Sequence, residues 1–170
     1  MDYKIDVIMA NEPDVCVLAE RFLQSYRSRY EKGIPLYVLK SFISSPRLFD
    51  VCWREFKCNE FVAVGNSFLD QNTMLADGRQ KTYAISLDQW NVLQNEYATV
   101  SDYKWDDKTI SIIQVWPYDA RSLTFDQLVL AVAVSYTEVE LLAEPRLCGA
   151  LNDLLSEYGV ESYWEPRLYG

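Results

Sequence analysis

Residues 45–58 read SPRLFDVCWREFKC, and the interpretation of this stretch decides the fold that the sequence predicts. Serine is a favoured helix N-cap and proline is preset for the first helical turn, so Ser45 and Pro46 form a helix start. Apolar residues then recur at the spacing of one helix face, and these are Leu48, Val51, Cys52 and Phe56. The stretch is therefore predicted to be a helix.

Two further helices are predicted before this one. Apolar residues recur at three- and four-residue spacing in 14–32 and stop at Gly33, which favours a helix. Residues 34–45, IPLYVLKSFISS, predict a second and shorter helix that opens at Pro35. Together with 45–58, the N-terminal part of the chain thus predicts three helices.

After the third helix the sequence changes to strand-like patterns. FVAVGNSFL (61–69) and KTYAIS (81–86) flank Asp77-Gly78, a dipeptide typical of hairpin turns. ATVSDYKW (98–105) and KTISIIQVW (108–116) predict a second hairpin. The sequence therefore predicts two β-hairpins.

The second half of the chain also carries clear helix starts. Capping-box pairs occur at Ser86 with Gln89 and at Thr124 with Gln127. They open one helix at the end of the first hairpin and another over 125–143, and Glu144-Pro145 begins a last helix. The tripeptide Pro-Arg-Leu occurs at Pro46, Pro145 and Pro166, and at the first two positions we interpret it as a helix start, with an arginine-presenting motif as the alternative.

These elements predict an α+β protein. Its first part, 1–86, is a helical trio with a hairpin, and its second part, 87–170, is an acidic α+β subdomain with a helix, a hairpin and two closing helices. A single compact domain is the alternative, because 170 residues suffice for one core.

The order of three helices and a hairpin in residues 13–86 resembles a winged helix domain. In that family the third helix enters the DNA major groove and the hairpin flanks it. The resemblance implies nucleic-acid contacts through residues 40–60 and 79–81, made by Arg47, Arg54, Lys57, Arg79 and Lys81. Winged helices also act as protein-binding modules, so the resemblance leaves both functions open.

The net charge of −9 is unevenly distributed. Residues 13–60 hold eight Lys/Arg and six Asp/Glu, whereas residues 61–170 hold seven and 16. Such an acidic half attracts a basic protein surface, although an acidic face that only keeps the chain soluble is the alternative. The candidate partner-binding acids form two clusters, Asp102, Asp106 and Asp107 in the first, and Glu138, Glu140 and Glu144 in the second.

The sequence contains no histidine, which excludes Ser-His-Asp catalysis and histidine metal sites. Gly-rich phosphate-binding motifs are also missing, and the four cysteines form no CxxC pair. We therefore expect no cofactor and no metal site. The two acidic clusters leave a carboxylate- or metal-dependent enzyme as an alternative.

The sequence predicts a cytoplasmic location. Its start has no apolar signal-peptide centre, its most apolar run (128–136) is too short to span a bilayer, and its cysteines suit a reducing compartment. The leading hypothesis is a non-enzymatic intracellular interaction protein whose acidic C-terminal half binds a basic partner, as inhibitors, antitoxin-like proteins, immunity-like proteins and adaptors do. A winged helix DNA-binding regulator is the alternative.

Overall fold

The fold is that of a computed structural model, which describes residues 34–35, 40, 45–57, 60–76, 80–104, 107–155 and 160–161. The chain forms two compact units. Residues 46–123 make up the first, here named the sheet unit, and residues 1–45 with 124–170 make up the second, the helical unit. The sheet unit is thus contributed by one continuous stretch between the two parts of the helical unit.

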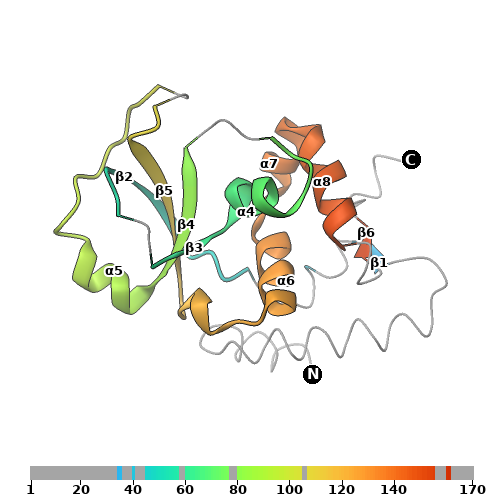
Figure 1. The fold of residues 1–170 in the computed structure, drawn as a ribbon, viewed down its shortest axis with the longest axis horizontal. Coiled ribbons are helices and arrows are strands. Elements are labelled where there is room, and N and C mark those ends of the chain that lie inside the picture. The colour runs from blue at the N-terminus through green and yellow to red at the C-terminus, as the bar shows by residue number, and fades with distance from the viewer. Residues whose placement is uncertain are drawn as a thin grey trace. The chain divides into compact units, whose positions relative to one another are not determined.

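The sheet unit is built on a four-stranded mixed sheet with the order β2-β5-β4-β3 (Figure 1). The central pair, β5 and β4, is parallel, and each outer strand is antiparallel to its neighbour. The strands are β2 (Phe49–Arg54), β3 (Val62–Ala63), β4 (Lys81–Ser86) and β5 (Ile110–Trp116). The α+β class predicted from the sequence is confirmed.

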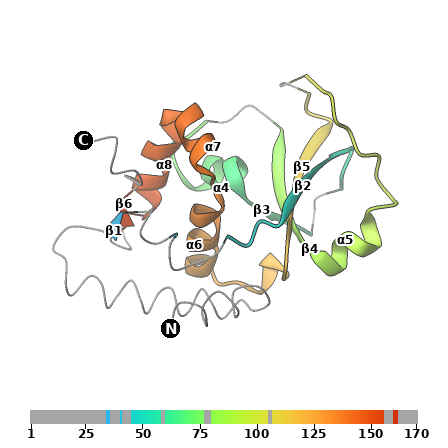
Figure 2. The same ribbon diagram turned by 180° about the vertical axis from the view of Figure 1, so that it is seen from behind.

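Two helices of the sheet unit cover opposite faces of this sheet (Figures 1 and 2). The helix α4 (Gly65–Asn72) joins β3 to β4, and its first residue lies against Thr82 and Gln114. The helix α5 (Leu87–Leu93) belongs to the crossover that the parallel pair β4 and β5 requires. A short 3-10 helix, η1 (Ala120–Ser122), follows β5.

The predicted third helix is wrong, because residues 49–54 form the strand β2. The apolar positions of this short stretch fit both periods, and Phe49, Val51 and Trp53 alternate onto one face of the sheet. Pairing with β5 along the whole of β2 provides hydrogen-bond partners for its backbone N–H and C=O groups. In a helix these groups would have been paired within the helix itself. The described residues therefore contain no three-helix winged helix unit.

The remaining N-terminal predictions fall largely outside the described residues. The helix predicted over 14–32 lies there entirely. Within 34–45, Lys40 is helical, but Ile34–Pro35 form a short strand, β1, that pairs in parallel with β6 (Val160–Glu161). The second helix therefore does not open at Pro35.

Neither hairpin forms as predicted. Only Val62–Ala63 of the predicted first strand forms a strand, and α4 begins at Gly65, so β3 is joined to its antiparallel neighbour β4 by way of a helix. Asp77-Gly78 lies outside the described residues. The segment before β5 pairs instead with the outer edge of β2, where Ala98 O accepts from Arg54 N at 3.2 Å and Val100 N donates to Cys52 O at 2.8 Å.

Three helices of the helical unit lie wholly within the described residues, and the residues at which they begin agree with the capping rules. They are α6 (Phe125–Ser135), α7 (Glu138–Ala143) and α8 (Pro145–Leu155). The capping boxes predicted for α5 and α6 are confirmed, and Pro145 is the first residue of α8. One prediction is wrong here: the helix expected over 125–143 is broken at Tyr136, because Thr137 forms a third capping box with Glu140 and starts α7.

The predicted boundary near residue 86 lies at the end of β4, inside the sheet unit. The predicted domains 1–86 and 87–170 stay a prediction.

Two glycines provide a matched test of this fold. Gly65 has φ +54, and an added Cβ would lie 3.3 Å from Thr82 Cγ2 and 3.4 Å from Gln114 Nε2. Gly65→Ala is therefore expected to lower the free energy of unfolding by about 1–2 kcal/mol. Gly149→Ala is the control, because it lies within α8 with nothing within 4 Å of the added Cβ, and it should raise stability by about 0.5–1 kcal/mol. Denaturant unfolding followed by circular dichroism measures both, and equal effects would contradict the described backbone at Gly65.

Candidate functional site

The first predicted acidic cluster lies in the sheet unit, just before β5. Asp102 is exposed, whereas Asp107 accepts hydrogen bonds from the backbone N and the Oγ1 of Thr109 at 2.9 and 2.6 Å. These hydrogen bonds, with help from the Arg54 guanidinium 3.7 Å away, hold the pKa of Asp107 below its usual value. Asp106 lies outside the described residues. Asp107 thus stabilises the entry into β5, which is a structural role.

The second predicted acidic cluster lies on and beside α7 in the helical unit. Glu138 is exposed in the first turn of the helix. Glu140 completes the capping box by accepting from Thr137 N at 2.9 Å, and Glu144 pairs with Arg146 at 2.7 Å. The two clusters belong to different units, and each is a site of its own.

α7 also exposes apolar side chains, which the sequence analysis did not single out. Val139 is 75% exposed and Leu142 is 46% exposed, whereas Leu141 is buried. Side chains three and four residues apart share one face of a helix, so Val139 and Leu142 lie together with Glu138 beside them. We name these three residues the α7 surface. The sequence EVELLA contains these apolar residues, but the prediction of one continuous helix over 125–143 did not indicate that two of them are exposed.

A lysine from the N-terminal part of the helical unit lies near the same acids. The Lys40 ammonium donates a hydrogen bond to the carbonyl oxygen of Tyr136, the C-cap residue that follows α6. A cation is favourable there because the last carbonyls of a helix carry partial negative charge. Burial lowers the pKa of Lys40, and the carboxylates of Glu140 and Glu138 act in the opposite direction. The acids of α7 therefore already act on an ammonium group of this chain.

The cations proposed for nucleic-acid binding are spread over the sheet unit, and three of them contact acids. Arg47 forms an ion pair with Asp50 at 2.6 Å, Arg54 lies 3.7 Å from Asp107, and Lys81 lies 3.8 Å from Asp70. Lys57 is exposed, and Arg79 lies outside the described residues. The recognition helix that grouped Arg47, Arg54 and Lys57 is replaced by β2, and nucleic-acid binding by these residues stays a prediction.

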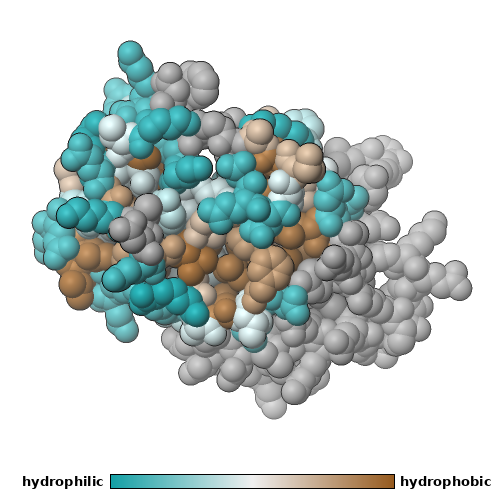
Figure 3. All heavy atoms as spheres, in the orientation of Figure 1, coloured by the Kyte–Doolittle hydropathy of each residue, from teal (hydrophilic) through white to brown (hydrophobic). Residues whose placement is uncertain are grey.

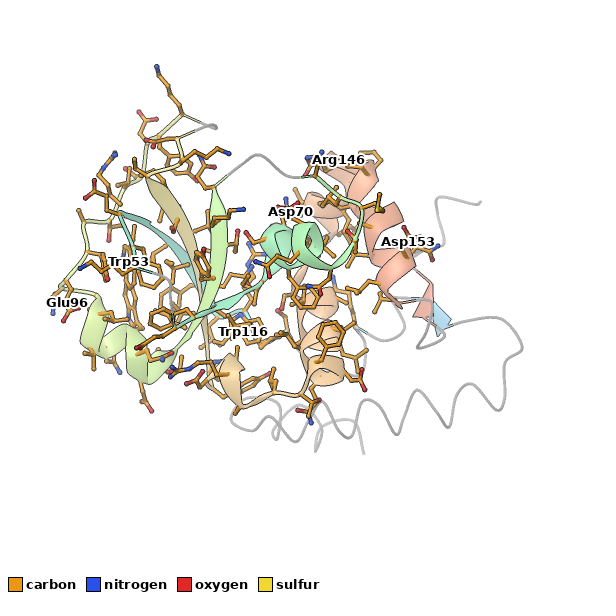
Figure 4. The ribbon with its side chains drawn as sticks, in the orientation of Figure 1. Trp53, Asp70, Glu96, Trp116, Arg146 and Asp153 are labelled. Carbon is orange, nitrogen blue, oxygen red and sulfur yellow. The ribbon has the colours of Figure 1, made fainter. Side chains whose placement is uncertain are left out.

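An aromatic cluster, which the sequence analysis did not single out, lies between the sheet and α5. Trp53 is fully buried there (Figure 4) and stacks on Trp90 and Tyr97, with ring centroids 5.7 and 5.2 Å apart. The chain turns back after β2 at Glu55, whose φ of 56 is left-handed, and Phe56 then contacts Trp53 at 5.4 Å. The buried Nε1 of Trp53 finds no hydrogen-bond acceptor among the residues that the structure describes.

The sheet unit exposes apolar side chains on α5 as well, in the brown area at the lower left of Figure 3. Val92 is 68% exposed and Leu87 is partly exposed, and no residue of α5 is fully buried. Phe49, also partly exposed, contacts Trp90 edge-on at 5.2 Å. Through the contact of Phe49 with Trp90, the aromatic cluster is continuous with the exposed apolar side chains of the sheet unit.

No protein-family model, curated protein sequence or solved structure matches the chain. Across the part of the chain that the structure describes, no three or more Cys, Asp or Glu side chains gather in a way that would hold a metal ion. No helix within the same residues combines the length and the apolar character needed to cross a membrane. The candidate sites are therefore judged from the geometry of this chain itself.

Tyr103 and Cys52 give a pH-dependent test of the sheet edge. The Cys52 sulfur and the Tyr103 hydroxyl oxygen form a hydrogen bond at 3.4 Å, and this contact, followed by burial, favours the protonated hydroxyl and raises the pKa of Tyr103 from 10.0 to about 12. An unfolded chain loses this proton near pH 10, whereas the folded chain keeps it until about pH 12. The stability that Tyr103 contributes is therefore complete below pH 10 and is lost as the pH rises to about 12.

Denaturant unfolding of the wild type and of Tyr103→Phe across this pH range should show an advantage of the wild type that shrinks as pH rises. Cys52→Ala, which removes the main cause of the raised pKa, should show a weaker pH dependence than the wild type. Stability curves of all three proteins that run parallel from neutral pH upward would contradict the pairing of Cys52 with Tyr103.

Proposed function

We propose that the protein is a non-enzymatic interaction protein that binds a basic protein partner through the acidic region around α7. The observation that supports it is the charge of residues 124–155, a stretch that the structure describes without a gap. One basic residue, Arg146, stands there against five acids, Asp126, Glu138, Glu140, Glu144 and Asp153.

Such a stretch creates a negative potential that speeds encounters with a basic partner and weakens as salt is added. The exposed carboxylates are well suited to this, because solvent-exposed acids steer association without a cost of desolvation in the free protein. The complete lack of histidine in the sequence, which removes the commonest acid–base group, also favours binding over catalysis.

The test compares two variants from which the same charge is removed. Glu138→Gln with Asp153→Asn neutralises two exposed acids of the helical unit, and Asp88→Asn with Asp102→Asn neutralises two exposed acids of the sheet unit. The full-length wild type, immobilised at low salt, is expected to capture a basic protein in stoichiometric amount from an extract of its source cells. Raising the salt should release the partner, and the first variant should need several-fold less added salt than the wild type.

The second variant should behave as the wild type, because its charges lie in the other unit. Capture that is absent at every salt concentration, or that both variants leave unchanged, would overturn the proposal. Equal weakening in both variants would assign the binding to the net charge of the whole chain rather than to the region around α7.

A further inference from the structure

The contact between α4 and the sheet contains a group of buried polar side chains. Ser67 of α4, Thr82 of β4 and Gln114 of β5 expose 4, 6 and 4% of their surfaces. Thr82 and Gln114 lie on the same face of the sheet, on neighbouring strands. The first turn of α4 is held against them, because Val64 N donates to Thr82 O at 3.0 Å and Thr82 N donates to Ser67 Oγ at 2.8 Å.

One donor of this group, the side-chain amide of Gln114, lacks a partner. Gln114 Oε1 accepts from Trp116 Nε1 at 3.1 Å, and because an indole nitrogen only donates, this bond fixes which end of the amide is the oxygen. Gln114 Nε2 lies 3.4 Å from the position that a Cβ would take on Gly65. Among the residues that the structure describes, Nε2 has no hydrogen-bond acceptor. A buried amide donor costs free energy unless an acceptor reaches it.

Gly65 is the first residue of α4, so Gln114 Nε2 faces the N-terminus of a helix. The first N–H groups of an α-helix have no acceptor within the helix and carry partial positive charge. The N-cap residue of α4, Val64, provides no side-chain hydrogen bond, and the first turn contains no acid. The backbone of this turn and the Gln114 amide are therefore neighbouring donors that an external acceptor would satisfy together.

An oxyanion is the acceptor that these donors fit best, because its oxygens accept hydrogen bonds and its charge is favourable at a helix N-terminus. The cations at adjoining positions are engaged with acids, Arg47 with Asp50 at 2.6 Å and Lys81 with Asp70 at 3.8 Å. Asp50 is also the residue of β2 that pairs with the strand position of Gln114. A singly charged carboxylate therefore suits the site better than a phosphate dianion, which needs compensating cations.

We propose that the start of α4 and the Gln114 amide bind the carboxylate group of a small ligand or of a peptide C-terminus. Gly65 and Ser67 supply backbone N–H groups, and Gln114 supplies Nε2. Capture of a terminal carboxylate by backbone N–H groups is a recurring mode of peptide recognition. The site belongs to the sheet unit alone, so it is separate from the acidic region around α7 and goes beyond the proposed function.

Acetate is the probe, and acetamide is its neutral counterpart of the same shape. In 1H–15N spectra of the full-length protein at fixed ionic strength, acetate should shift the backbone amide signals of Gly65 and Ser67 and the side-chain amide signal of Gln114. The three signals should saturate with one dissociation constant. The signal of Gly149, in α8 of the helical unit, should not move, and acetamide should move none of them.

Gln114→Met removes the amide donor and keeps the length of the side chain. It should weaken acetate binding about tenfold, as expected for the loss of one hydrogen bond to a charged group. Gln80→Met is the matched control, because Gln80 is an equally buried glutamine of the sheet unit whose Nε2 donates to Lys104 O at 2.9 Å. This variant should keep the affinity of the wild type for acetate. The titration of the wild type tests the site even if Gln114→Met does not fold.

Shifts that are absent in the wild type, or that acetamide reproduces, would overturn the proposal and leave water as the acceptor for Gln114. Unchanged affinity in Gln114→Met would overturn it as well, and so would inorganic phosphate that binds at these signals more tightly than acetate. Acetyl-diglycine and its C-terminal amide identify the source of the carboxylate. Binding of the free-acid peptide together with acetate supports a peptide C-terminus, whereas binding of acetate without the peptide supports a small ligand.

Discussion

The pairing of β2 with β5 is the constraint on which the sheet unit depends. It runs over all six residues of β2 and places Phe49, Val51 and Trp53 on the face that α5 covers. Trp53 then fills the space between Trp90 and Tyr97, two residues that are far from it in sequence. A fully buried tryptophan contributes a large apolar area, and stacking adds to it, so this side chain holds α5 and the turn after it against β2.

The elements that the sequence predicted well are those specified by neighbouring residues. Serine or threonine followed by glutamine three residues later marked the starts of α5 and α6, and Pro145 marked α8, because these signals satisfy backbone groups within a single turn. The strand β2 was missed for the opposite reason. Its apolar residues fit a helix as well as a strand, and only β5, about 60 residues later in the sequence, decides between them.

The same distinction applies to the candidate site. The sequence contains every acid of the second cluster, but not the break at Tyr136 that turns residues 138–143 into a separate helix with Val139 and Leu142 exposed. The signal for that break, Thr137 followed by Glu140, is present in the sequence as another capping-box pair, and the sequence analysis did not use it. Lys40 could not be placed from the sequence at all, because its contact with Tyr136 joins residues 96 positions apart.

The distribution of charge between the two units is the reason to look for a basic partner at the helical unit. In the sheet unit, Arg47, Arg54 and Lys81 each lie within 4 Å of an acid. The charges of these acids are therefore compensated by neighbouring cations. In residues 124–155 the single arginine is paired with Glu144, and the sequence of this stretch contains five acids against that one base. Lys40 supplies one cation from elsewhere in the same unit, at the junction of α6 and α7. Since like charges on a short stretch repel one another, a partner that brings further cations to this region lowers the repulsion as well as forming contacts of its own.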